Sequence, residues 1–257
     1  MRVSSKTRWL PKAGSSTREY EDAFEPARAS PSDMVARVRF AVADGASESL
    51  LAGRWAKLLV RTFCSAADDA LSTTTFAQAL GQWPDLLSRY LEARERRGQP
   101  IQWFEEPGLQ RGAFSTFVGL QLHEHESARK WAAVAIGDSC LLHFRTGDLL
   151  ETFPREPGDS FDTNPVLICS KGNVSGELAE HAIYSQGTFE VGDAFVLVTD
   201  AVAAWFLAAQ ADGRGAWAKQ LFEASTGSDF DGWVRELRKD GSMRNDDVTV
   251  MQISVVQ

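Results

Sequence analysis

The chain has 257 residues, which is long enough for one large domain or two small ones. Its hydrophobic fraction of 44% and its charged fraction of 24% are those of an ordinary globular protein, which argues against a disordered chain. The formal net charge is −8, and because an acidic surface repels polyanions we expect no nucleic acid as the main partner.

The N-terminal part of the chain predicts a loop, a strand and a helix. Residues 24–37 contain two prolines and many polar residues, which is typical of a loop. The apolar run "VRFAVADG" then predicts a short buried strand that ends near Gly45. Apolar side chains recur at helical spacing over residues 47–67, with Ser47 as the candidate N-cap.

A second helix and a series of strands are predicted next. The helix covers residues 74–97, with a bend at Pro84, and a polar connection follows over residues 98–111. Short apolar runs separated by turn signals predict strands over residues 113–122, 130–138 and 140–151, the last with a hairpin turn at "TGD". Residues 154–190 show little periodicity and are predicted to be loops, where a substrate-facing flap is expected.

The C-terminal part returns to regular patterns. The predicted elements are a strand over residues 189–200, helices over 201–211 and 229–241, and a last strand over 245–256. Runs of strands separated by a few helices favour antiparallel sheets with helices packed outside them, in an α+β layered domain.

Cysteine usage and hydropathy indicate the compartment. The three cysteines lie far apart and form no CxxC pair, so we expect neither a disulfide framework nor a zinc knuckle. The first residues lack the apolar core of a secretory signal. The longest apolar run, residues 194–209, is short for a membrane span and carries Asp200 near its middle. We therefore expect a cytoplasmic protein with no membrane span.

Acidic residues recur at the ends of the predicted strands. Three apolar runs each end on one carboxylate, a fourth begins beside one, and an acidic pair lies near the N-terminus: Asp44, Asp138, Asp200, Asp246, Glu21 and Asp22. Carboxylates that converge on one cleft repel each other, and hard divalent cations relieve that repulsion. Two such ions about 4 Å apart can clamp a phosphate. Each acid alone is better explained as a turn residue, a cap or part of a solvated loop, and spacing alone names no reaction.

Six blocks in order carry a family resemblance: "YEDAF", "FAVADGASES…WA", "GAFSTFVGLQL", "WAAVAIGDSCLLHFRTGDLL", "GDAFVLVTDAVAAWF" and "NDDVTVMQISV". From about residue 18 to the C-terminus, the chain resembles the bacterial-type PP2C (PPM) family of metal-dependent protein serine/threonine phosphatases. The resemblance implies one domain over residues 1–257. It also implies a four-layer α/β/β/α sandwich with two central antiparallel sheets.

The same resemblance implies a site for two Mg²⁺ or Mn²⁺ ions, with a third in some members. By motif match Asp44 would bridge the two ions, and the Gly45 carbonyl would bind one of them. The other implied metal ligands are Glu21, Asp22, Asp138, Asp200 and Asp246. Asp44, Asp200 and Asp246 would form the catalytic set, which activates a water that attacks the phosphorus in line.

Four positions depart from the family pattern. Ala46 stands where some members have a histidine that protonates the leaving group, so the general acid is unassigned. Ala201 replaces a common glycine, which alters the turn but keeps the ligand before it. Arg18 is the candidate phosphate-binding arginine, although its spacing from the acidic pair is about one residue short. A one-residue slip would exchange Asp246 and Asp247.

The first interpretation is a phosphatase that hydrolyses phosphoserine or phosphothreonine in a protein substrate and opposes a protein kinase. An alternative from another class is a catalytically weak, phosphatase-like module that regulates or binds phosphoproteins. Ala46 and Ala201 favour the module, whereas the retained acids favour the enzyme. A remoter alternative is a metal-dependent hydrolase of small phosphoesters.

Overall fold

The computed structural model describes residues 1–26, 36–66, 71–125, 128–161, 165–172, 180–213 and 217–256. Parts of the predicted loop at 24–37 and of the predicted flap at 154–190 lie outside these ranges.

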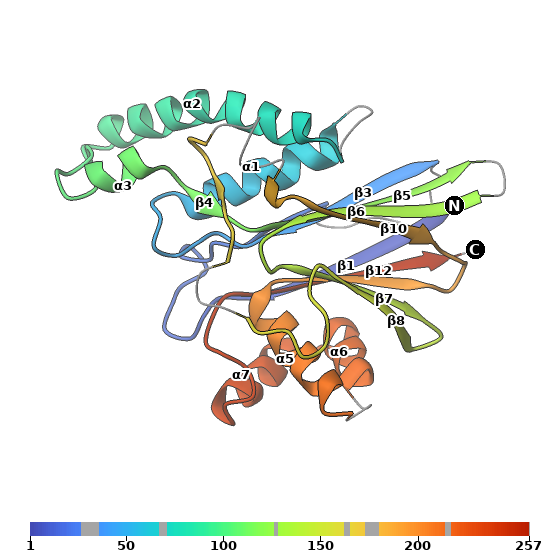
Figure 1. The fold of residues 1–257 in the computed structure, drawn as a ribbon. Coiled ribbons are helices and arrows are strands. Elements are labelled where there is room, and N and C mark those ends of the chain that lie inside the picture. Colours follow the sequence, from blue (N-terminus) through green and yellow to red (C-terminus); the bar gives the residue numbers. More distant parts are fainter. Residues whose placement is uncertain are drawn as a thin grey trace.

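Two antiparallel five-stranded sheets form the middle of the molecule (Figure 1). The first sheet contains, in order of pairing, β1 (Arg2–Leu10), β12 (Val248–Val256), β11 (Ala194–Val198), β7 (Cys140–Arg145) and β8 (Asp148–Phe153). The second contains β10 (Ile183–Thr188), β6 (Ala128–Ile136), β5 (Phe117–His125), β3 (Arg37–Ala43) and β2 (Ala23–Glu25). A short third sheet pairs β4 (Phe114–Ser115) with β9 (Ile168–Cys169).

Helices cover the outer face of each sheet, as Figure 1 shows. One face carries α1 (Ala52–Ser65), α2 (Thr73–Arg96) and the short α3 (Glu106–Arg111). The other face carries α5 (Asp200–Ala211), α6 (Trp217–Thr226) and α7 (Phe230–Lys239). The order of layers is therefore helix, sheet, sheet, helix, and the predicted α/β/β/α sandwich is confirmed.

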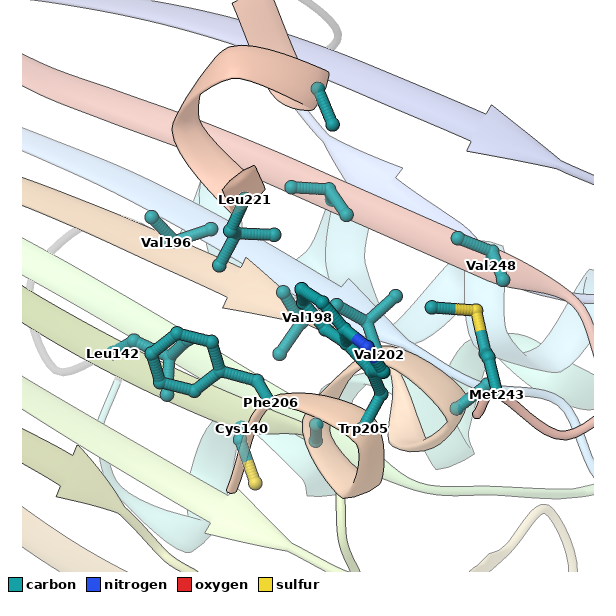
Figure 2. Close-up of a cluster of buried hydrophobic side chains, with 14 of the residues drawn as sticks. Cys140, Leu142, Val196, Val198, Val202, Trp205, Phe206, Leu221, Met243 and Val248 are labelled. Carbon is teal, nitrogen blue, oxygen red and sulfur yellow. The ribbon is translucent and has the colours of Figure 1, made fainter. Parts of the chain in front are cut away.

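Three groups of buried apolar side chains hold the layers together. Between the two sheets, Phe40, Leu120 and Leu197 are each 0% exposed and belong to one group. Above the second sheet, Trp55 of α1 packs with its neighbours in a second group. The third group joins the first sheet to α5 and α6, and Figure 2 shows Trp205 and Phe206 of α5 within it. This arrangement explains why the strands read as nearly continuous apolar runs, since both faces of each sheet are covered.

Several predicted elements are confirmed at close to their predicted bounds. The hairpin between β7 and β8 turns at Thr146 and Gly147. Both residues have positive φ, as a two-residue type I′ turn requires. The predicted second helix is present as α2, which continues through Pro84.

The start of α1 differs from the prediction. The helix begins at Ala52, and Leu51 in the left-handed conformation is its N-cap, so the assignment of Ser47 as N-cap was wrong. Residues 46–49 form a turn instead, closed by a 2.8 Å hydrogen bond from the Ser49 amide to the Ala46 carbonyl. The predicted helix began too early because the residues of this turn are mostly polar and carry no helical pattern of their own.

Other elements were missed because their apolar signal is weak. The strand β1 has few apolar residues but pairs with β12 along its whole length. The strand β10 lies within the predicted loop at 154–190, and most of its residues are exposed. The short helix α3 occupies part of the predicted connection at 98–111, and β2 occupies the start of the predicted loop at 24–37.

Candidate functional site

One cleft of about 680 Å³ collects carboxylates from three separate places in the chain. Asp44 directly follows β3, Asp200 is the first residue of α5 after β11, and Asp246 lies just before β12. Gly45 and Arg244 also line this cleft. Three of the six predicted acids thus share this cleft, whereas Glu21, Asp22 and Asp138 are not among the described residues that line it.

The backbone around Asp44 is fixed by the junction between β4 and β5. The Asp44 carbonyl accepts hydrogen bonds from the Ser115 hydroxyl at 2.8 Å and from the Thr116 amide at 2.9 Å. The Asp44 amide donates to the Thr116 hydroxyl at 3.2 Å. With both backbone groups bonded, the direction of the Asp44 side chain is set by the framework.

Gly45 is required by a close approach of two backbone segments. A Cβ placed on Gly45 would lie 2.8 Å from the Glu21 carbonyl oxygen and 2.8 Å from the Ala52 carbonyl carbon. Both neighbours are backbone atoms, which cannot move away cheaply. The glycine therefore brings the acidic pair at residues 21 and 22 against the strand end that carries Asp44.

Asp246 and Asp247 have different surroundings, although they are adjacent. Asp247 is buried, and its carboxylate accepts the Lys12 amide at 2.8 Å and the Glu21 amide at 2.7 Å. Asp246 accepts the amide of Asp247 at 2.9 Å and lines the cleft. Asp246 thus faces the cleft, and Asp247 anchors the N-terminal loop.

Asp22 is buried close to Asp44 and Asp200. With Asp138 and Asp246, these carboxylates form one acidic group. Its Oδ2 accepts a hydrogen bond from the Thr249 hydroxyl at 2.6 Å, and its Oδ1 has no partner among the described residues. Burial, and then repulsion from Asp247 and Asp200, raises the pKa of Asp22 well above its usual range. Burial and repulsion from Asp22 likewise raise the pKa of Asp44. Both carboxyls would ionise more readily with a cation between them.

Asp138 and Asp200 form the other end of the acidic group. Asp138 is 1% exposed, and within the described ranges neither of its carboxyl oxygens has a hydrogen-bond partner. Burial raises the pKa of Asp138, and the charges of Arg244 and Arg155 oppose that rise. Burial also raises the pKa of Asp200 to about 7, again against the effect of Arg244. The Asp200 Oδ2 lies 3.0 Å from the Arg244 Nη2.

Glu21 and Arg18 line a separate hollow of about 570 Å³, together with Lys12, Arg54 and other residues. The Glu21 backbone touches the Asp44 segment, and burial raises the pKa of the Glu21 side chain. Arg18 is exposed. The structure therefore brings the Glu21 backbone to the acidic group and leaves Arg18 in the neighbouring hollow.

The fold matches solved phosphatase structures over the whole chain. The serine/threonine phosphatase PstP/Ppp of Mycobacterium tuberculosis is 14% identical, with a TM-score of 0.56 and 100% of both chains covered. The catalytic domain of PstP in complex with two manganese ions is 15% identical, with a TM-score of 0.52 over 99% of this chain and 100% of that one. The chain has the PP2C-type phosphatase fold.

A further structure with this fold is PppA, a regulatory component of T6SS in Pseudomonas aeruginosa. It is 18% identical, with a TM-score of 0.53 over 99% of this chain and 98% of that one. No protein-family model matches the chain, and no curated protein sequence matches it. The PP2C resemblance in the sequence is thus confirmed at the level of the fold.

Two arginines of this PP2C-type chain line the cleft and were not singled out from the sequence. Arg111 ends α3, in a segment predicted to be an irregular connection, so no pattern pointed to it. Arg244 lies two residues before Asp246, and that proximity was the available signal.

The carboxylates that line this cleft, together with the buried Asp22 and Asp138 close to them, fit a hard divalent cation. In the described parts of the chain, no three His, Cys, Asp or Glu side chains are already arranged to hold one ion. However, Asp22, Asp138 and Asp200 each have a buried carboxyl oxygen without a hydrogen-bond partner among the described residues. Buried, unpaired carboxylate oxygens that repel each other are the donors that Mg²⁺ and Mn²⁺ prefer.

Proposed function

We propose that the protein is a Mg²⁺- or Mn²⁺-dependent phosphatase that hydrolyses phosphoserine or phosphothreonine in a protein substrate. The observation that carries the proposal is the convergence of Asp44, Asp200 and Asp246 on one cleft from three separate parts of the chain. Asp246 accepts one backbone amide and Asp200 faces Arg244, whereas both carboxyl oxygens of Asp247 accept backbone amides. The PP2C-type fold supports the same conclusion.

The residues of the chain would hold and position the ions. Asp44 would contact both ions, Asp200 and Asp246 would each contact one, and Asp22 would act from its buried position beside Asp44. Glu21 and the Gly45 carbonyl remain predicted ligands, and Asp138 remains the predicted ligand of a third ion. When bound, divalent ions supply Lewis-acid polarisation of a phosphoryl oxygen and lower the pKa of a coordinated water.

Arg111 is the side chain that we assign to substrate binding. It lines the cleft and has a planar guanidinium, which suits two oxygens of a phosphoryl group. Arg18 remains a predicted phosphate ligand, in which role it would act from the neighbouring hollow. Four histidines are present in the sequence, and none belongs to the described lining of this cleft. A leaving alkoxide would therefore take its proton from water.

The proposal is tested by phosphate release from a phosphothreonine peptide and from p-nitrophenyl phosphate. Each is measured with Mn²⁺, with EDTA, and with Asp200→Asn in place of the wild type. We expect turnover that requires Mn²⁺ and falls by at least about 100-fold in the variant, since charge stabilisation at a phosphoryl centre supplies factors of this size. Turnover of the small ester alone would indicate a phosphoesterase of small molecules. Turnover unaffected by EDTA would contradict the proposal.

A regulatory, phosphoprotein-binding module is the second candidate. The observation that favours it is the ion pair between Arg244 and Asp200, which engages a carboxylate that a catalytic ion would need. Absence of turnover in protein that binds a phosphopeptide would support this candidate.

The partner and location follow from the proposed activity. A protein phosphatase implies an opposing serine/threonine kinase, and we propose a cytoplasmic location for the pair. Within the described ranges, no helix combines the length and apolar character needed to cross a membrane.

A further inference from the structure

Arg244 lies in a turn whose backbone is held by hydrogen bonds and by one buried side chain. The residue before it, Met243, is buried in the apolar group that joins the first sheet to α5 and α6, and Figure 2 shows its side chain there. The Met243 amide donates to the Leu237 carbonyl at 2.9 Å, and the Asp246 amide donates to the Arg244 carbonyl at 3.1 Å. The backbone of Arg244 is therefore fixed, and its side chain starts from a defined point beside the acids.

The guanidinium of Arg244 contacts the acidic group at the end that Asp138 and Asp200 form. Its Nη2 lies 3.0 Å from the Asp200 Oδ2, and its charge also acts on Asp138. The contact is an ion pair without directed hydrogen bonds, because Nε and Nη2 have no hydrogen-bond partner among the described residues. A guanidinium that serves to fix a carboxylate usually forms a two-pronged hydrogen-bonded pair. Charge compensation is thus the main interaction.

The carboxylates at this end still have unused donor atoms. Both oxygens of Asp138 and the Oδ1 of Asp200 are buried without a partner in the described parts of the chain. One monovalent guanidinium compensates less charge than a divalent ion and leaves these oxygens uncoordinated. The end formed by Asp138 and Asp200 is therefore suited to a divalent cation, and Arg244 supplies positive charge at the same place.

We propose that Arg244 is an internal cation that takes the place of one divalent ion at the Asp138–Asp200 end of the cleft. This inference rests on the proposed function, because it assumes that the remaining acids bind divalent ions. The wild type would then bind two ions around Asp44, and Arg244 would exclude the third ion that the motif match assigns to Asp138. Neutralising Arg244 would open that position, since removing a positive charge beside a cation site strengthens cation binding.

The test is calorimetric titration of the full chain with Mn²⁺, comparing wild type with Arg244→Met. Methionine keeps an unbranched stem without the charge, and Arg244→Gln provides a second neutral variant if the first fails to fold. Arg244→Lys retains the charge and is expected to behave as wild type. Arg235→Met is the matched control, because Arg235 is 71% exposed and its nearest carboxylate, that of Asp231, is 3.9 Å away on α7.

We expect the neutral variants to bind one more Mn²⁺ per chain than the wild type, or to bind the weakest ion at least about tenfold more tightly, a change of about 1.4 kcal/mol. Adding Asp138→Asn to Arg244→Met should remove the additional ion, which places it at Asp138. Thermal unfolding gives a second readout. In EDTA the neutral variants should have a lower melting temperature than the wild type. Mn²⁺ should raise the melting temperature of the variants by more than it raises that of the wild type.

The outcomes separate this inference from the proposed function. Equal stoichiometry and affinity in wild type and both neutral variants would overturn the inference and leave a metal-binding wild type intact. Binding by the neutral variants alone would support the inference and contradict metal dependence of the wild type. Absence of binding in every variant would overturn both.

Discussion

At the scale of single residues, Asp246 and Asp247 are adjacent in the chain but have different surroundings. Asp247 uses both carboxyl oxygens to hold the amides of Lys12 and Glu21, whereas Asp246 faces the cleft. Sequence spacing could not separate these two residues, because a slip by one position exchanges them. Their surroundings separate them, since a carboxylate saturated by backbone amides has few lone pairs left for a cation.

Substituting Asp247 should therefore mainly lower stability, and substituting Asp246 should mainly weaken metal binding. Asp247→Ala is expected to lower the free energy of unfolding by about 3 kcal/mol, because it leaves two amides without their charged acceptor. Asp246→Ala should change stability by less than about 1 kcal/mol and weaken Mn²⁺ binding at least about tenfold. Urea unfolding in EDTA and calorimetry measure the two quantities. The reverse pattern would assign the ligand to Asp247.

The raised pKa values predict how the metal-free protein responds to pH. The pKa of Asp200 is raised to about 7, and that of Asp138 is also raised, in both cases mainly by burial. A folded-state pKa above the unfolded value means that the folded chain binds the proton more tightly. The stability that this proton contributes is full below about pH 4, and it is lost as the pH rises through the folded value.

In EDTA, the free energy of unfolding should therefore decrease between about pH 5 and about pH 8. Asp200→Asn removes the carboxyl whose pKa is raised to about 7, so it should flatten this decrease. Urea unfolding at several pH values is the measurement. A variant with the same pH profile as the wild type would show that Asp200 does not titrate in this range.

At the scale of elements, the connection from β3 to α1 determines the site. The strand ends at Ala43, Asp44 follows, and Gly45 lets the backbone of the acidic pair approach before α1 begins. The sequence predicted this strand and its carboxylate, because a continuous apolar run ending in "ADG" is a clear signal. It did not predict where α1 begins, because the left-handed conformation of Leu51 has no signature in the sequence.

A methyl group at Gly45 should disturb this connection. Gly45→Ala is expected to destabilise the fold by about 2 kcal/mol, because its Cβ would meet two backbone segments. The matched control is Gly81→Ala in α2, where the Cβ meets nothing within 4 Å. That change should stabilise the protein by about 1 kcal/mol, since alanine is a better helix former than glycine. Equal effects in thermal unfolding would show that the close approach at Gly45 carries no cost.

At the scale of the whole molecule, packing between the sheets brings distant strand ends together. The strand β1 pairs with β12, and β3 packs across the interior from β11, so the first and last parts of the chain share one core. We propose on this ground that residues 1–257 form one domain. The four layers were predictable from the order of motifs. The pairing of β1 was not, because its few apolar residues give little periodicity.

The core between the sheets should dominate stability. Leu197→Ala removes a side chain that is 0% exposed and is expected to cost about 3 kcal/mol. Leu150→Ala on β8 is the matched control, because Leu150 is 50% exposed and its truncation should cost less than about 0.5 kcal/mol. Chemical denaturation measures both. Comparable losses would contradict the placement of Leu197 between the sheets.

The central claim is that carboxylates from separate strand ends hold divalent cations in one cleft. Anomalous X-ray scattering from crystals grown with Mn²⁺ tests it most directly, because it locates the ions without reference to activity. We predict anomalous peaks within about 2.5 Å of carboxylate oxygens of Asp44, Asp200 and Asp246, a distance typical of hard cations. Crystals without a peak beside any of these three residues, from protein saturated with Mn²⁺, would contradict it.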